Sequence, residues 1–292
     1  MSTAYAWSPY CGTPPFPAAL WTTWRLDPTL VGVLLAIAVL YCVGYRRLQR
    51  DDAGLLPTRW QVCAALGGWL IASLALVSPL CPLSVALFAA RSAQHVLLTM
   101  LAAPLLVLAR PAACLAAAFV GAGRACTVRA EPESSLRTPL SAAAAFAVSI
   151  WIWHMPAPYT ATFQSTAVYW LMHASLIGTS LWLWQTLLRT SNESLPGSML
   201  AGIASTVQMG LLGALITLAP RPLYEPHWLT TDAWGLAPLQ DQQLGGVIMW
   251  VCGCTGFLVV ALFDMGRALA QTALRPTAAT VRMRATAQTP SR

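Results

Sequence analysis

The chain has 292 residues, of which 57% are hydrophobic and only 9% are charged. This composition excludes an ordinary soluble domain, in which about a quarter of the residues are charged. The formal net charge is +7, but the basic residues are all arginines in loops between apolar stretches, which excludes a nucleic-acid-binding surface. The sequence therefore predicts an all-α integral membrane protein that has lipid as its surroundings.

Seven apolar stretches predict a transmembrane domain over residues 28–270, because a helix of ~20 apolar residues crosses a hydrocarbon core of ~30 Å. The preceding segment, 1–27, is rich in proline and lacks a basic run, so we expect a periplasmic segment and not a cleaved signal peptide. Segment 111–123 is too short to cross and is expected to continue the third span or to lie at the interface. In chain order, the expected spans are 28–45, 60–78, 92–109, 139–155, 167–188, 198–219 and 243–264.

The arginines predict the direction in which the chain crosses the membrane, because translocated loops are depleted of basic residues. With seven spans and the N-terminus outside, 14 of the 17 arginines fall on the cytoplasmic side, and only Arg25, Arg91 and Arg221 fall outside. We therefore expect a periplasmic N-terminus and a cytoplasmic C-terminus in a bacterial inner membrane. The tail 271–292 is expected to be disordered and to lie on anionic headgroups.

Eight cysteines are scattered along the chain without a CxxC motif, so they do not indicate a disulfide framework. Two of them, Cys11 and Cys81, fall on the predicted outer side. These two could pair in an oxidising periplasm.

All four histidines fall toward the predicted outer face. His95 begins the third span, His154 ends the fourth, His173 lies about two turns into the fifth, and His227 lies in the last outer loop. Ionisable groups inside a membrane are costly and usually functional, although each histidine could instead make an interhelical hydrogen bond. As a set, the histidines predict a functional site in the outer half.

Sulfur and carboxylate side chains accompany these histidines. Met155 and Met172 adjoin His154 and His173, and imidazole with thioether suits Cu(I), although methionine is also an ordinary core residue. On the seventh span, Asp241, Gly245 and Met249 share one helix face, and Gly245 would let another helix approach closely. Asp241 could cap its own helix, ligate a metal or orient a ligating imidazole.

Arg91 is the strong cation beside this group. It could pair with Asp241, bind an anionic group such as a haem propionate, or extend into the lipid headgroups.

Three segments carry a family resemblance: QHVLLTMLAAPLLVLARP at 94–111, WIWHMPAPYTATF at 151–163 and PLQDQQLGGVIMW at 238–250. They resemble the signature segments of the multi-pass CtaG family of cytochrome c oxidase assembly factors, with similar order and spacing over roughly residues 20–270. The resemblance implies a role in forming active haem-copper oxidase through metal handling at the outer membrane face. It implies no catalytic reaction.

The resemblance also implies which residues act. A departure lies at Arg91, where an HxxQH pattern would place a second histidine one turn before His95. The expected metal site therefore consists of the histidines at 95, 154 and 173, completed by Asp241, a methionine such as Met249, or His227, with Tyr159 and Arg91 as contacts for a bound cofactor. The matching positions are His95, His154, Pro156, Tyr159, His173, Asp241 and Met249.

The expected cargo is copper as Cu(I), and the expected partners are membrane lipid, oxidase subunits and a periplasmic copper carrier. One alternative is a membrane redox protein that binds haem through histidines on facing helices. A copper permease is less favoured, because a pathway across the membrane would need polar residues at mid-membrane. These are sparse, and Gln208 is the main one. The sequence contains neither a nucleophile elbow nor an HExxH motif, so it does not indicate a hydrolase.

Overall fold

The computed structural model describes residues 8–51, 56–109, 111–120, 139–188 and 195–274, with side chains to residue 271, and these residues form helices joined by turns and short loops. The tail predicted to be disordered lies outside the described residues from 275 onward, as does most of the connection after residue 120. The described elements are η1 (Pro17–Thr22), α1 (Pro28–Arg50), α2 (Arg59–Val77), α3 (Leu80–Ala86), α4 (Phe88–Val96), the π-helix η2 (Leu97–Ala102), α5 (Ala103–Ala109), α6 (Ala112–Val120), α8 (Pro139–His154), α9 (Pro156–Gln164), α10 (Thr166–Leu188), α11 (Leu195–Thr217), η4 (Glu225–His227), η5 (Asp232–Trp234) and α12 (Pro238–Leu274).

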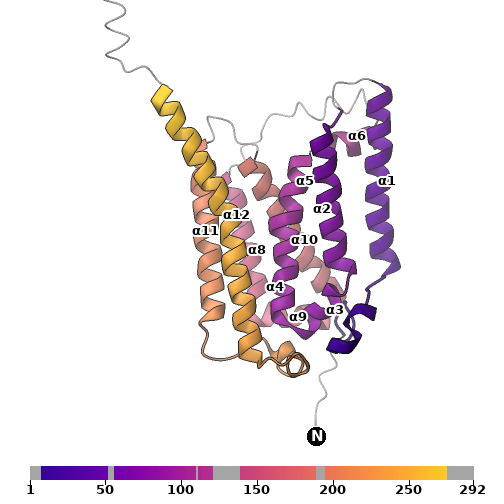
Figure 1. The fold of residues 1–292 in the computed structure, drawn as a ribbon, viewed down its shortest axis with the longest axis vertical. Coiled ribbons are helices and arrows are strands. Elements are labelled where there is room, and N and C mark those ends of the chain that lie inside the picture. The colour runs from indigo at the N-terminus through magenta and orange to yellow at the C-terminus, as the bar shows by residue number, and fades with distance from the viewer. Residues whose placement is uncertain (1–7, 52–55, 110, 121–138, 189–194, 275–292) are drawn as a thin grey trace, which may run out of the picture.

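The long helices run side by side as one bundle (Figure 1). The short helices α3 and α9 lie at one end of this bundle, together with the last residue of α8 and the first residue of α12. The short helix α6 lies at the opposite end, beside the last turns of α1. We call these the α9 end and the α6 end.

Five described helices are long and apolar enough to cross a membrane: α1, α2, the continuous run Phe88–Ala109, α11 and most of α12. Helices α8 and α9, bent by 72° between His154 and Pro156, would make a sixth if counted as one span. The predicted multi-span helical architecture is thereby confirmed for five or six spans. Helix α10 has 23 residues, but its tryptophans, histidine and hydroxyl residues lower its mean hydropathy.

Several boundaries differ from the predicted ones. Segment 111–123 does not continue the third span but contains the separate helix α6, which packs on α1. The third run begins at Phe88, so that Arg91 lies within the helix and not before it. Helix α12 continues to Leu274, beyond the predicted end of the span at residue 264.

Helix α1 begins at a clear sequence signal and ends on a close contact. Asp27 accepts hydrogen bonds from the backbone N–H groups of Thr29 and Leu30, which stabilises the first turn. Near the other end, Gly44 lies so close to the Cys114 carbonyl of α6 that no Cβ would fit. The α6 end of α1 is therefore held by backbone proximity, which only glycine permits.

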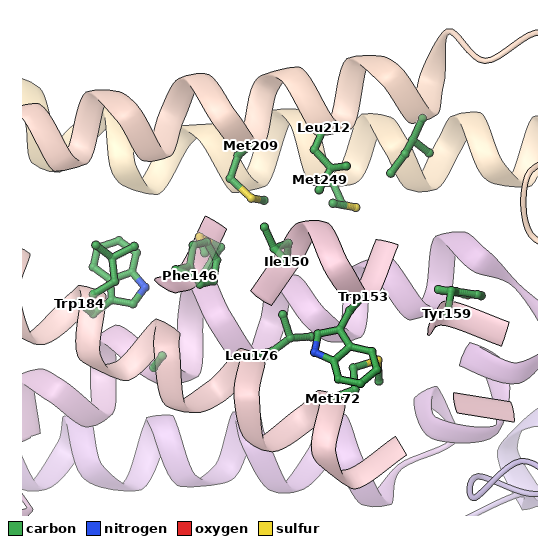
Figure 2. Close-up of a cluster of buried hydrophobic side chains, with 14 of the residues drawn as sticks. Phe146, Ile150, Trp153, Tyr159, Met172, Leu176, Trp184, Met209, Leu212 and Met249 are labelled. Carbon is green, nitrogen blue, oxygen red and sulfur yellow. The ribbon is translucent and has the colours of Figure 1, made fainter. Parts of the chain in front are cut away.

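The bundle core is built from large apolar side chains of α8, α10, α11 and α12. Figure 2 shows Met209 and Leu212 of α11 and Met249 of α12 opposite Phe146 and Ile150 of α8. Helices α11 and α12 approach closely because glycines stand at their crossing. A Cβ at Gly213 would come within 2.9 Å of the Trp250 backbone, for example. Without this core, the polar residues at the α9 end would have no fixed support.

Candidate metal centre at the α9 end

Three imidazoles from three helices meet at the α9 end. The His95 ring on α4 lies 6.0 Å from the His154 ring, the last residue of α8, and 5.5 Å from the His173 ring on α10, measured between ring centroids. None of the three side chains is more than 6% exposed. The structure thus brings together the three intramembrane histidines that the sequence singles out.

Backbone carbonyls orient two of these rings. Nδ1 of His154 lies 2.7 Å from the Ile150 carbonyl oxygen, and Nδ1 of His173 lies 3.0 Å from the Tyr169 carbonyl oxygen. A ring nitrogen that donates to a carbonyl carries the proton, so Nε2 keeps its lone pair. This is the arrangement by which proteins prepare an imidazole as a metal ligand.

The remaining ring nitrogens give a test of whether a metal would fit. Within the described chain, Nδ1 and Nε2 of His95 and Nε2 of His173 are buried without a hydrogen-bond partner. A buried polar atom without a partner costs roughly 1–3 kcal/mol, and a metal ion would give such nitrogens a bond. Imidazole nitrogens of this kind can bind a metal, but among the described residues no group of three or more His, Cys, Asp or Glu side chains is placed so that it could hold a metal ion.

Arg91 lies one helical turn before His95 and is buried in a cage of aromatic rings. Its guanidinium carbon lies 4.4 Å from the Phe163 ring centroid and 4.9 Å from that of Tyr159. One Nη atom donates to the Thr162 hydroxyl at 2.7 Å and approaches the Met172 sulfur at 3.9 Å. The suggested pairing with Asp241 is not found: among the described residues, no carboxylate lies within ion-pair distance of Arg91.

Tyr159 joins α9 to the loop before α12. Its hydroxyl lies 2.6 Å from Nε2 of His227, and its ring packs on Phe88. Burial lowers the pKa of His227 to about 3, and the nearby Arg91 charge contributes to the same shift. His227 is therefore neutral, and its contact with Tyr159 fixes the loop over the three imidazoles of the candidate site.

Asp241 uses both carboxylate oxygens on the backbone of a neighbouring helix. Oδ2 accepts from the Phe88 N–H at 2.7 Å and Oδ1 from the Ala89 N–H at 3.0 Å. These are the free donors at the start of α4, so Asp241 caps the helix that carries His95, not its own helix. Ligation by Asp241 stays a prediction, and its contacts favour the positioning role.

Gly245 explains how α12 reaches α4 at this point. A Cβ at Gly245 would collide with the Phe88 ring and lie 3.0 Å from the Ser92 hydroxyl. The expected close approach of another helix at Gly245 is therefore confirmed. Met249, one turn further along α12, is fully buried in the core (Figure 2).

A disulfide fixes the N-terminal segment at the same end. Cys11 and Cys81 are bonded, with their Cα atoms 5.3 Å apart, which confirms the suggested pairing. The Tyr169 hydroxyl lies 3.3 Å from the Cys11 sulfur, and the Tyr169 ring packs on His173 at 4.3 Å. The sequence does not predict this connection, because Tyr169 belongs to no motif and only the fold brings it to the two cysteines.

These features define a multi-span helical membrane protein with a buried imidazole group at one end of its bundle. The chain belongs to the Caa3_CtaG family, the cytochrome c oxidase caa3 assembly factor, whose family model matches residues 39–271. The resemblance noted in the sequence is thus confirmed over most of the chain. No curated protein and no solved structure matches the chain.

Proposed function

We propose that this assembly factor binds Cu(I) at the periplasmic face of the membrane and supplies it during formation of cytochrome c oxidase. The observation that carries the proposal is that His95, His154 and His173 are buried together. Ring nitrogens of these histidines have no hydrogen-bond partner or keep a free lone pair, so they are available to bind a metal. Soft and borderline donors of this kind suit copper. The family supplies the oxidase as the destination, and the role is binding and delivery, not catalysis.

Differences between the two ends of the bundle support the periplasmic location. The disulfide between Cys11 and Cys81 lies at the α9 end, and disulfides persist in oxidising compartments. The α6 end carries Arg46, Arg50 and Arg59, as expected for a cytoplasmic face. Counting α10 and the bent pair α8–α9 as crossings gives seven spans, with the N-terminus outside and the C-terminus inside.

Arg91 favours a singly charged metal. A buried guanidinium without a carboxylate partner raises the electrostatic cost of every positive charge brought near it. Cu(I) adds one such charge, whereas Cu(II) or Zn(II) adds two. Arg91→His, which restores the histidine expected from the family pattern, should therefore increase binding of divalent metal relative to Cu(I).

The expected partners follow from this location. Lipid surrounds the bundle, oxidase subunits receive the metal in the plane of the bacterial inner membrane, and a periplasmic copper carrier delivers it from the α9 end. Tyr159 and Arg91 then act beside the metal site: Tyr159 holds His227 and the loop, and Arg91 supplies the positive charge.

Metal analysis of purified protein tests the proposal. After Cu(I) loading under reducing conditions, wild type should retain one copper ion, and His154→Ala and His173→Ala should each weaken binding by at least ~100-fold, because each removes a ligand. Arg221→Gln is the control, because Arg221 is an exposed residue of the last loop before α12. Copper in that variant should equal wild type.

Two results would oppose the proposal. Wild type that binds no copper, together with full oxidase activity and copper content in a strain lacking the protein, would end it. A Soret band in protein purified from haem-replete cells would instead support the haem alternative.

A further inference from the structure

A cavity of about 460 Å³ lies between α1 and the rest of the bundle, toward the α6 end. Its walls come from α1, α2, α5, α6 and α10 and are mostly apolar; they include Ile37, Leu66, Trp69, Leu115 and Leu181. Sites for small molecules have volumes of ~300–1,000 Å³. The cavity is therefore large enough for a flexible hydrocarbon chain.

Helix α1 packs mainly on α6 and contacts α2 and α5 at only a few points, one of which is Tyr41 against Ala65 and Ala109. Near the α6 end, Gly44 lies against Cys114 of α6. Toward the α9 end, the Trp69 indole donates to the Leu34 carbonyl at 3.2 Å. Between these contacts, the small side chains of Ala38 and Ala65 line the wall and leave the space unfilled.

Basic side chains extend the same faces beyond the cavity. On α1, Arg46 lies one turn after Cys42, a residue that lines the cavity. Arg46 is therefore ~6 Å closer to the α6 end than Cys42. Arg59 begins α2 seven residues before the lining residue Leu66, which is ~10 Å along that helix and on nearly the same face. Both arginines are exposed.

Among the described side chains at the α6 end of α1 and α2, arginines outnumber acidic residues. Arg47 is occupied, because its guanidinium donates to the Ala117 and Ala118 carbonyls at the end of α6. Asp51, directly after the last residue of α1, is the acidic residue among the described side chains beside these arginines. Among the described side chains, Arg46, Arg50 and Arg59 outnumber it, so this end of the two helices suits an anionic group.

We propose that this cavity binds an acyl chain of an anionic phospholipid, with the lipid phosphate held by Arg46 and Arg59. The apolar walls match the chain, and the two arginines match the headgroup. A transmembrane helix of a partner fits less well, because a helix with side chains is ~10–12 Å wide and would fill far more than this cavity. The site is separate from the metal centre, and its test does not depend on copper.

Native mass spectrometry of the purified full-length protein tests the proposal, with phosphatidylglycerol and phosphatidylcholine as probes. Wild type should bind one phosphatidylglycerol saturably and in preference to phosphatidylcholine. Ala38→Trp fills the cavity and should weaken binding of both lipids by roughly tenfold. Arg46→Gln and Arg59→Gln should each reduce only the preference for phosphatidylglycerol, by about fivefold.

Matched controls separate these effects from damage to the fold. Ala36→Trp adds the same ring on α1 at an exposed position that does not line the cavity, and Arg221→Gln removes an exposed charge near the α9 end. Both should bind lipid as wild type does. Every variant should elute as a single species with its Cys11–Cys81 disulfide intact.

Three outcomes would overturn the proposal. Ala38→Trp could bind phosphatidylglycerol as tightly as wild type, or the two arginine variants could keep the full lipid preference. Alternatively, a purified oxidase subunit could bind wild type but not Ala38→Trp while lipid binding stays unchanged. That last result would make the cavity a docking site for a protein helix.

Discussion

The α9 end of the bundle and the region beside α1 differ in how tightly their side chains are packed. At the α9 end, buried polar groups from the N-terminal segment, α4, α8, α9, α10, the last loop and α12 contact one another, and a disulfide, a capping carboxylate and an aromatic cage fix them. Beside α1, apolar walls leave a cavity that lipid can fill. The comparison indicates that buried imidazoles and a guanidinium are held in place by tight packing, whereas the apolar walls beside α1 are packed less tightly.

Removing the capping carboxylate should have the largest effect. Asp241→Ala leaves two buried N–H groups at the start of α4 without an acceptor, and each charge-assisted bond contributes roughly 1.5–3 kcal/mol. We expect the free energy of unfolding to fall by about 3–5 kcal/mol, measured by thermal or denaturant unfolding in detergent. Copper binding should weaken with it, because α4 carries His95.

Asp264→Ala is the comparison at the α6 end. Asp264 is also buried, but it accepts from the Ser198 hydroxyl at 2.7 Å and pairs with Arg267 at 3.4 Å, so it holds side chains and not a helix start. We expect a smaller loss of stability and unchanged copper binding. Equal losses in the two variants would show that the α9 end is not specially constrained.

Loss of the disulfide should have the next largest effect. Cys11→Ser opens a link between residues 70 positions apart, and such links contribute roughly 2–4 kcal/mol. The apparent melting temperature should fall, and reduction of wild type should reproduce the change. Cys42→Ser, an exposed free cysteine on α1, should melt as wild type does.

A methyl group at the crossing of α4 and α12 should cost less. Gly245→Ala pushes against the Phe88 ring, and overpacking of this kind costs about 1–3 kcal/mol. Gly178→Ala on α10 is the matched control, because open space surrounds its Cβ position and alanine is the better helix former. Differential unfolding of the two variants should therefore have opposite signs.

Acidification should destabilise wild type progressively. His227 has a folded-state pKa of about 3, below its ordinary value of 6.5, so the unfolded chain binds the proton first. Its contribution to stability is complete above pH 6.5 and is lost as the pH falls from 6.5 toward 3. The difference in melting temperature between wild type and His227→Gln should shrink over that range, and a constant difference would contradict the assignment.

The sequence was sufficient to predict a helical membrane protein of several spans, its family and the three histidines that meet at the α9 end. Apolar runs and arginine asymmetry carry that information over long segments. It did not predict α3 or α9, which are too short to stand out, and for segment 111–123, which contains α6, it left open a continuation of the third span or an interfacial segment. The roles of Asp241 and Tyr169 were also beyond it, because each acts on a partner more than 80 residues away.

The π-helix after His95 divides its span into two halves, α4 and α5. Its extra residue rotates the side chains of α4 about the helix axis relative to those of α5. In that turn the Thr99 carbonyl is bonded by two side chains of α10, the Ser180 hydroxyl at 2.8 Å and the Trp184 indole at 2.7 Å. Each residue of an α-helix advances the azimuth by ~100°. Deleting one residue between 97 and 102 would therefore rotate His95 away from His154 and His173 while α5 kept its neighbours, so the direction of the His95 ring depends on the extra residue of the π-helical turn.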